Sequence, residues 1–348
     1  MPIEARRTFR LALTVTLALV LAYGSGIAVP YLAPLLALIL TLKPAPPMPA
    51  GKLLVLALAL ALILWIGLLV APIMEQYAPV GLSLVALGLF VSSRLSLGGD
   101  KAAVGTLLAM SLTLISALGV FSLALAQTLV SMLVAAVVIA VVSQWVVYPF
   151  FPESELEAEA TSVAQTTDEE LAEKRLTEQT SAVRAVVVIL PAYLFLLINP
   201  TGHTPVMMKS ILLAQAPSVI EARQAAIELL GATVVGGFLA VLLWFGLKLS
   251  PRLDIFALLI LSVMILLARK LYVPGETRLS QQFWIDASVT MLILLGPAVA
   301  DSAAGKDPYQ AFLFRFGMFF LVAVYAWGSM VLLNRLGWLG GRQEGVVT

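Results

Sequence analysis

Charged side chains inside long apolar runs are the residues of this sequence that could do chemistry. Lys209 lies in the segment TPVMMKSILLAQ, and Asp286 lies in QQFWIDASVTMLILLGP. A charged residue at the centre of a membrane helix costs about 2.5–3.5 kcal/mol on insertion scales, so it usually faces a cavity or a partner. We predict that Lys209 binds an anionic group and that Asp286 carries a coupling proton.

Both residues also have a plainer interpretation. The flexible stem of Lys209 could carry its amine to the membrane surface. Asp286 could pair with an arginine such as Arg269, because charges inside membranes generally pair. Glu228 has the same two interpretations as Asp286, proton coupling or structural pairing.

Two short helices are predicted at matching places in the two halves of the chain, at 30–42 and 205–216. They would extend only about 20 Å and 18 Å, less than the roughly 30 Å hydrocarbon core. Short segments beside prolines in corresponding positions indicate a transport site, since helix N-termini present N–H groups to an anion. Ordinary tilted helices are the alternative. The predicted substrate-binding residues are Lys209, Pro30, Tyr31, His203 and Thr204.

Four arginines mark the ends of predicted helices in both halves of the chain, namely Arg10, Arg94, Arg184 and Arg269. Basic residues at helix ends are typical orientation anchors on the cytoplasmic side. The alternative is a basic vestibule that raises the local concentration of anions.

The composition sets the class of protein that must position these residues. Of 348 residues, 61% are hydrophobic and only 12% are charged, which excludes an ordinary soluble domain. The sequence has no cysteine and one histidine, so we expect no metal site and no cofactor. The basic residues form no patch, so we expect no nucleic-acid partner. No nucleophile–base set is evident, and we expect no enzyme activity.

The apolar segments predict an all-α polytopic membrane protein with about twelve helices. The uncharged run 102–148 is too long for one crossing, so a turn is expected near Gly119–Gln127. An acidic cytoplasmic linker at 152–181 separates two six-helix membrane repeats, 1–151 and 182–348. The helices are expected near 9–27, 30–42, 53–72, 79–95, 102–121, 124–148, 184–199, 205–216, 226–247, 253–269, 283–300 and 311–333.

Three pairs of landmarks indicate that the two halves are a duplication. LWIGL at 64–68 and LWFGL at 243–247 are 179 positions apart, and the pairs Arg10/Arg184 and Arg94/Arg269 are 174 and 175 apart. An even number of crossings in each half predicts parallel repeats. Sixteen of the 21 basic residues fall on the side of the N-terminus, which predicts that both termini are cytoplasmic.

The segment RTFRLALTVTLALVLAYGSGIAVPYLAPLLALILTLKP combines an arginine-led helix, a glycine-containing turn and a short helix opened by Pro-Tyr and closed by Lys-Pro. It resembles the start of the fusaric acid resistance and aromatic acid exporter superfamily, most of all its compact twelve-helix bacterial members. EARQAAIELLGATVVGGFLA at 221–240 resembles another helix start of that superfamily. The chain departs from its pattern at Leu32 (usually Trp), at Glu228 (usually basic) and in its short central linker.

This resemblance implies a secondary transporter that exports small anionic, often aromatic carboxylic, compounds across the bacterial cytoplasmic (inner) membrane. It also implies a periplasmic adaptor (membrane fusion) protein as a partner. The sequence has no phosphate-binding loop, so we expect the proton gradient to drive export. A homo-oligomer is compatible with the sequence but is not required. The alternatives are a passive anion channel and a non-transport membrane assembly protein.

Overall fold

The computed structural model describes residues 2–42, 46–97, 102–152, 220–273 and 279–303, with single positions and short runs between 183 and 211 and between 313 and 328. All regular structure in these residues is helical. The chain forms two compact units. Unit 1 comprises Met1–Leu62, Gln127–Gln165 and Glu228–Gly317, and unit 2 comprises Ile63–Ala126, Thr166–Ile227 and Met318–Thr348.

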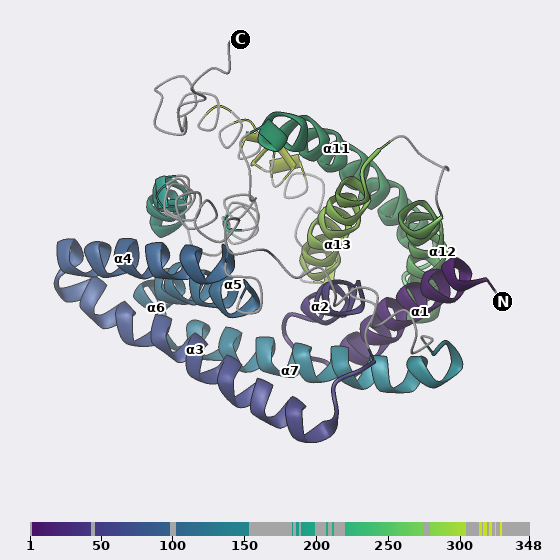
Figure 1. Cartoon of the computed structure of the whole chain (residues 1–348), viewed down its shortest axis with the longest axis horizontal. Helices are drawn as coiled ribbons and strands as arrows, with labels where there is room; N and C mark the ends of the chain where they lie inside the picture. Colours follow the sequence, from purple (N-terminus) through teal and green to yellow (C-terminus); the bar gives the residue numbers. More distant parts are fainter. Residues whose placement is uncertain are drawn as a thin grey trace, which may run out of the picture. The chain divides into compact units, whose positions relative to one another are not determined.

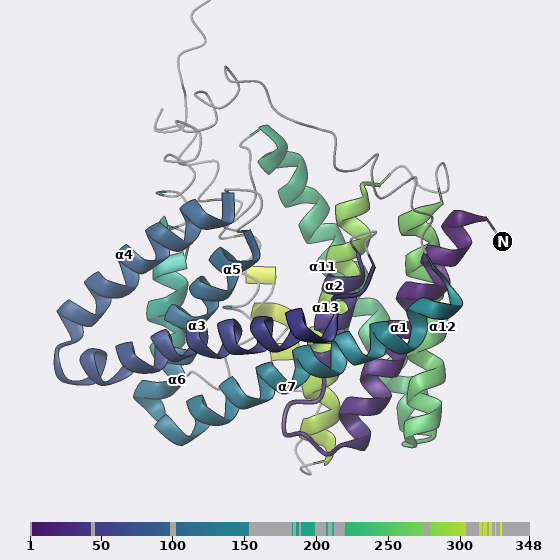
Figure 2. The same ribbon diagram turned by 60° about the horizontal axis from the view of Figure 1, so that its bottom comes forward.

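Unit 1 is a bundle in which α1 packs along α12 and against the short α2 (Figures 1 and 2), while α13 contacts both α12 and α2. Glycine permits the closest approach in this bundle, because a Cβ added at Gly296 of α13 would lie 2.2 Å from the Tyr31 Cβ. Its helices are α1 (Ile3–Gly24), α2 (Leu32–Thr41), the start of α3 (Ala50–Gln76), most of α7 (Leu123–Val147), η3 (Tyr148–Phe150), most of α11 (Ile220–Leu249), α12 (Leu253–Tyr272) and α13 (Gln281–Ala303).

Unit 2 contains the rest of α3, followed by α4 (Ala78–Leu97), which packs on α5 (Ala102–Met110). The helix continues from α5 through a π-helical segment, η2 (Ser111–Ile115), into α6 (Ser116–Phe121). The short apolar helix Ile189–Ile198 also belongs to this unit. Its Tyr193 is fully buried, and the Tyr193 hydroxyl lies 2.9 Å from the Ser116 hydroxyl.

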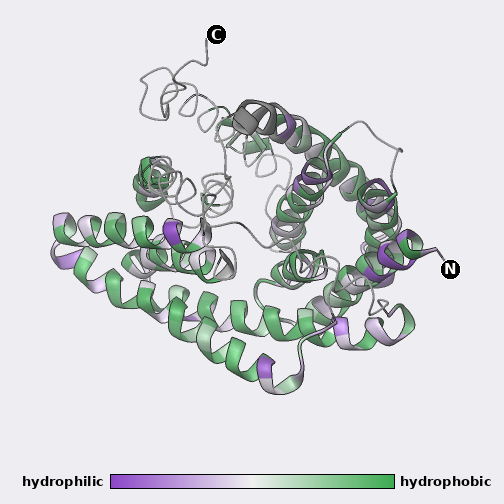
Figure 3. Ribbon diagram, in the orientation of Figure 1, coloured by the Kyte–Doolittle hydropathy of each residue, from purple (hydrophilic) through white to green (hydrophobic). Residues whose placement is uncertain are grey.

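Eight helices within the described residues are long and apolar enough to cross a membrane. The visible sides of α3 and α7 are mostly hydrophobic in Figure 3, and large apolar side chains such as Trp65 are exposed. Exposed apolar surfaces of this kind are typical of helices that face lipid. The chain is therefore an all-helical, multi-pass membrane protein, as its composition predicts.

The helix boundaries agree with the apolar segments at most places. The predicted turn at Gly119–Gln127 is confirmed, since Ser122 has an extended backbone between α6 and α7. Two helix starts are wrong: α11 begins at Ile220 rather than near residue 226, and α1 begins at Ile3 rather than near residue 9. The charged first residues hide the helix start from an apolar window, and Arg10 consequently lies well inside α1.

A hydroxyl from another helix engages the backbone of α3 in unit 2. Ser111 Oγ accepts a hydrogen bond from the Gly67 N–H at 2.9 Å and donates to the Ile63 carbonyl at 2.7 Å. These two backbone groups are four residues apart, so they are the pair that an α-helix joins. The approach is possible because Gly67 has no side chain, since an added Cβ would lie 2.0 Å from the Ser111 carbonyl oxygen.

We predict that Gly67→Ala destabilises the protein by about 1–3 kcal/mol, because the new methyl group overlaps the backbone of Ser111. Gly51→Ala, in the same helix α3 with open space around it, is the matched control and should be neutral or stabilising by about 0.5–1 kcal/mol. Thermal unfolding of both variants in detergent checks this. Equal midpoints for the two variants would contradict the close contact.

Candidate functional site

A cavity of about 350 Å³ in unit 1 is the strongest candidate for a functional site. It lies between the first half of α1, the end of α2, the start of α3 and the end of α7. The polar side chains that line it are Arg10, Thr14, Thr41, Lys52, Gln144 and Tyr148. A cavity with this many polar groups is suited to a polar ligand.

Helix α1 contributes Arg10 and Thr14, which are four residues apart and therefore share a face of the helix. Arg10 is only 5% exposed, and Thr14 is fully buried. The Arg10 guanidinium carbon lies 5.9 Å from the centre of the Tyr148 ring, within the range of a cation–π interaction. The Thr14 hydroxyl is buried without a hydrogen-bond partner, and an unsatisfied group of this kind needs an explanation.

Helix α7 and the residue after it contribute Val141, Gln144 and Tyr148, whose spacing places them on one face. The Gln144 amide nitrogen donates to the Thr41 hydroxyl at 3.0 Å. This bond joins α7 to the last residue of α2. This hydrogen bond thus holds the end of α2 against α7 at one side of the cavity.

The cavity exists because α2 is short. Its ten residues extend about 15 Å, half of a hydrocarbon core. The chain is not helical from Pro46 to Pro49, before α3 begins at Ala50. Non-helical backbone at membrane depth is tolerated where it is buried in protein or lines a cavity. These four residues all line this one.

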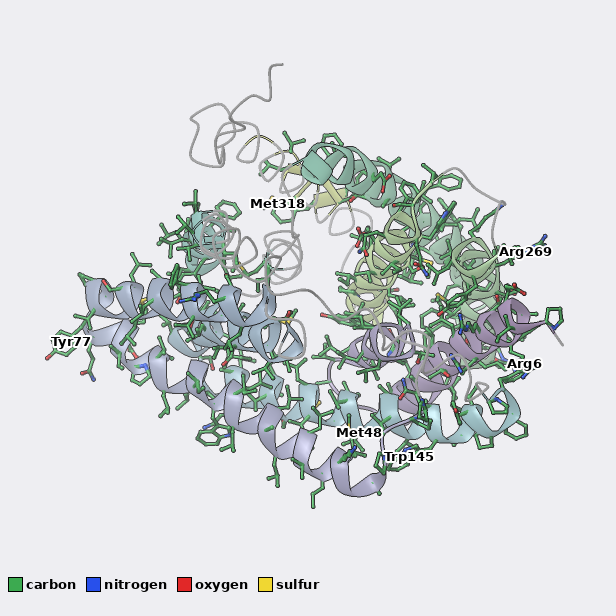
Figure 4. The ribbon with its side chains drawn as sticks, viewed as in Figure 1. Arg6, Met48, Tyr77, Trp145, Arg269 and Met318 are labelled. Carbon is green, nitrogen blue, oxygen red and sulfur yellow. The ribbon has the colours of Figure 1, made fainter. Side chains whose placement is uncertain are left out.

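The sequence of this connection reduces the number of backbone groups that need partners. Pro46, Pro47 and Pro49 carry no N–H, so three donors are absent. The Met48 carbonyl accepts a hydrogen bond from the Trp145 indole N–H at 2.7 Å, and the two residues lie next to each other in Figure 4. Trp145 therefore has a structural role beyond that of an interfacial aromatic residue.

The charges that line the cavity have one sign. Among the described lining residues, Arg10 and Lys52 are cationic and none is acidic. Electrostatic attraction is stronger in a poorly solvated site than in water. A guanidinium also offers paired N–H donors that match a carboxylate. The arrangement can therefore hold a small anion.

Of the four arginines singled out from the sequence, the structure places Arg10 in this cavity. Arg10 lies inside α1, seven residues after its first residue, and the interpretation of Arg10 as an orientation anchor stays a prediction. Arg94 and Arg269 are exposed in the last turns of α4 and α12, as expected of helix-end residues. Four other predicted site residues lie outside the described residues and stay predictions: Arg184, His203, Thr204 and Lys209.

Pro30 and Tyr31 were predicted to open the helix 30–42, but α2 begins just after them at Leu32, and neither residue lines the cavity. The N–H groups of Leu32 and Ala33 donate to the carbonyls of Val29 and Pro30, both at 3.4 Å. Helix α2 therefore offers the cavity its C-terminal end rather than its N-terminal one. A substrate role for Pro30 and Tyr31 remains a prediction.

The two predicted proton-coupling carboxylates lie in unit 1 outside the cavity. Asp286 of α13 is half-buried and accepts a hydrogen bond from the Gln282 amide at 3.1 Å. Glu228 of α11 accepts a hydrogen bond from the Ser280 hydroxyl. Ser280 in turn accepts a bond from the Phe283 N–H at the start of α13, so Glu228 helps to cap that helix.

Sequence reasoning missed Thr14, Thr41, Lys52, Gln144 and Tyr148 as site residues. Thr14 stands one helical turn after Arg10, and Gln144 is one of two amides in the uncharged run 102–148, the other being Gln127. Both positions were detectable as polar groups in an apolar segment. Their convergence was not detectable, because it depends on how α1, α2 and α7 pack.

These features define the class of protein: a multi-pass helical membrane protein with a cavity whose described charged lining residues, Arg10 and Lys52, are both cationic. The family described as "Protein of unknown function (DUF2955)" matches residues 7–147. This stretch includes every residue that lines the cavity except Tyr148. Comparisons with curated proteins and with solved structures found no match. The family match names no activity, and the resemblance to aromatic acid exporters stays a prediction.

We predict that Trp145→Phe lowers the free energy of unfolding by about 0.5–1.5 kcal/mol, because it removes the hydrogen bond that the part-buried Met48 carbonyl accepts. The matched control is Trp65→Phe, which makes the same change at an exposed tryptophan of α3 and should alter stability little. Thermal unfolding in detergent measures both. An equal effect of the two substitutions would show that the hydrogen bond does not support the connection.

Proposed function

We propose that the protein is a secondary transporter that exports small anionic organic compounds, aromatic carboxylates among them, across the bacterial cytoplasmic (inner) membrane. One observation supports this most. Arg10 is almost fully buried within a membrane helix and lines a cavity of about 350 Å³. An ionisable residue in this position usually marks the pathway of a substrate or an ion.

The cavity suits an aromatic carboxylate in size and in chemistry. Its volume falls at the lower end of the roughly 300–1,000 Å³ range of small-molecule sites. The carboxylate would take the guanidinium of Arg10 and the hydroxyl of Thr14, which has no partner otherwise. The aromatic body would pack against Leu56, Val141 and the Tyr148 ring. In this proposal, Lys209 is a further cation of the pathway.

We propose the proton gradient as the energy source, with Asp286 and Glu228 as the coupling groups. Both are hydrogen-bonded carboxylates in unit 1, and Asp286 lies within a membrane span. Glu228 is tied to the start of α13, so a change in its protonation would alter the capping of that helix. This link between a proton and a helix end supports coupling.

Arg10→Gln should lower the transport of benzoate at least tenfold, because loss of a charge-assisted hydrogen bond costs about 1.5–3 kcal/mol. Arg10→Lys should retain part of the activity, since it keeps the charge but loses the paired donors. The measurement is pH-gradient-driven benzoate flux in proteoliposomes. Proteoliposomes have only one membrane, so transport across them does not require the periplasmic adaptor that we propose as a partner.

The control for this experiment is Arg94→Gln, which removes an exposed cation at the end of α4 and should leave flux unchanged. Unchanged flux in Arg10→Gln would refute the role of the cavity. Flux that depends on Arg10 but not on the pH gradient, together with currents in planar bilayers, would identify a passive anion channel. Absence of flux in the wild type would favour a membrane assembly protein.

We further propose the twelve-helix, duplicated architecture with both termini in the cytoplasm. The composition of the two units supports it. Shifted by 175 positions, Ile63–Ala126 of unit 2 falls within Glu228–Gly317 of unit 1, and most of Met1–Leu62 falls within Thr166–Ile227. Each unit thus combines the first helices of one half with the middle helices of the other, as expected of two interleaved repeats.

The orientation can be tested directly because the chain has no cysteine. In intact cells, a membrane-impermeant thiol reagent should label Ser25→Cys, in the turn after α1, and should not label Glu4→Cys, at the start of α1. In inside-out vesicles the labelling should reverse. The opposite pattern would show that the N-terminus lies outside, in contradiction to the distribution of basic residues.

A further inference from the structure

Unit 1 contains a second cavity, of about 580 Å³, which the transport proposal does not use. It lies where α1, α11 and α13 end and where α12 begins. The polar and aromatic side chains that line it are Tyr23, Trp244, Lys248, Arg252, Phe256 and Ser302.

Its place along the helices puts this cavity at one surface of the membrane. Tyr23 lies thirteen residues after Arg10 in α1, about 20 Å along the helix axis. The helices α1, α11 and α13 end at Gly24, Leu249 and Ala303, and α12 starts at Leu253. Tryptophan, tyrosine, lysine and arginine are the residues expected at such a surface. The two cavities of unit 1 thus lie towards opposite ends of α1.

Two buried hydrogen-bond donors of this cavity have no partner. They are the Tyr23 hydroxyl and the Trp244 indole N–H. Leaving a buried donor unsatisfied is unfavourable, and native structures rarely do so without a reason. An indole N–H can only donate, so its missing partner must be an acceptor. Both groups therefore call for a ligand that carries acceptor oxygens.

The distribution of such atoms strengthens this inference. Within the part of the chain that the structure describes, three buried side-chain polar atoms lack a partner. One belongs to Thr14, which lines the Arg10 cavity, and the other two belong to Tyr23 and Trp244. The unsatisfied atoms thus coincide with the two cavities and are not scattered through the helix bundle.

The charges and the apolar wall define the ligand further. Lys248 and Arg252 are both exposed at the rim. Arg252 pairs with Asp254 at 2.9 Å, but both side chains are largely solvent-accessible, and an exposed pair of this kind is weak. Phe256 packs edge-to-face on Tyr23 with ring centres 5.3 Å apart, which supplies an apolar wall. The combination fits a negatively charged oxygen-bearing head attached to an apolar body.

We propose that this cavity is a second binding site, separate from the Arg10 cavity, for an amphiphilic oxyanion whose head accepts hydrogen bonds from Tyr23 and Trp244. Lys248 and Arg252 attract the head, and Phe256 packs against its body. Two sources supply this chemistry at a membrane surface: an aromatic carboxylate and the headgroup of an anionic phospholipid. The proposal stands on this cavity and does not require transport through the Arg10 cavity.

The test compares thermal stability with and without ligand, because a ligand that binds the folded state raises the midpoint of unfolding. The protein is placed in nanodiscs of phosphatidylcholine and titrated with 1-naphthoate. In a second arm, phosphatidylglycerol replaces part of the phosphatidylcholine and no naphthoate is added. Stabilisation in the first arm assigns the site to a soluble acid, and stabilisation in the second assigns it to a lipid headgroup.

Two variants remove one donor each, Tyr23→Phe and Trp244→Phe. Without ligand, both should be as stable as the wild type or more stable, because an unsatisfied donor has been removed. With ligand, each should bind at least about tenfold more weakly, which corresponds to one lost charge-assisted hydrogen bond. Trp65→Phe, at an exposed tryptophan, is the matched control and should keep the ligand response.

Arg10→Gln separates this proposal from the proposed function. The ligand should still raise the unfolding midpoint of the Arg10→Gln variant, through Tyr23 and Trp244, even though this variant has lost transport. A ligand response that disappears in Arg10→Gln but is normal in Tyr23→Phe and Trp244→Phe would overturn the second site and leave the first intact. Absence of stabilisation in both arms would overturn the second site as well.

Discussion

The structure depends on one constraint: backbone polar groups at membrane depth need partners within the protein. A full-length membrane helix meets this requirement by itself, but α2 stops after ten residues. The chain then relies on three prolines, on Trp145 and on Gln144 to complete the connection to α3. Because α2 is short, it also leaves the cavity that Arg10 lines. Stability and a candidate binding site therefore have a common origin, namely a helix that is too short.

The two cavities of unit 1 show a related principle at opposite ends of α1. In each, a cation stands beside a buried polar group that has no partner. Evolution can keep such groups unsatisfied only if another requirement offsets their cost. Elsewhere in the described helices, serine and threonine hydroxyls find partners, either a carbonyl three or four residues earlier, as for Thr16 and Ser143, or a group on another helix, as for Ser111. Among the described residues, the buried polar atoms of Thr14, Tyr23 and Trp244 have none.

Much of the fold could be predicted from the sequence, because apolar length alone locates membrane helices. The shortness of α2 and the break at Ser122 were also predictable, the former from its prolines and the latter from the length of the run 102–148. The start of α1 could not be predicted, because Arg6 and Arg7 look like the charged residues that precede a membrane helix, whereas they lie within α1. The site could be predicted only in part. Arg10 was conspicuous as a charge, whereas the contacts of Thr14, Gln144 and Tyr148 arise from helices far apart in the sequence.

The hydroxyl of Ser111 gives α3 a mechanical property that its own sequence does not encode. It engages both members of one carbonyl–amide pair, Ile63 and Gly67, and Pro72 removes a further amide hydrogen five residues later. Helices bend most readily where a side chain enters their hydrogen-bond ladder or where proline interrupts it. The middle of α3 is thus where this helix is expected to bend, and η2 contacts it at that place. A shift of η2 would therefore change the support that α3 receives there.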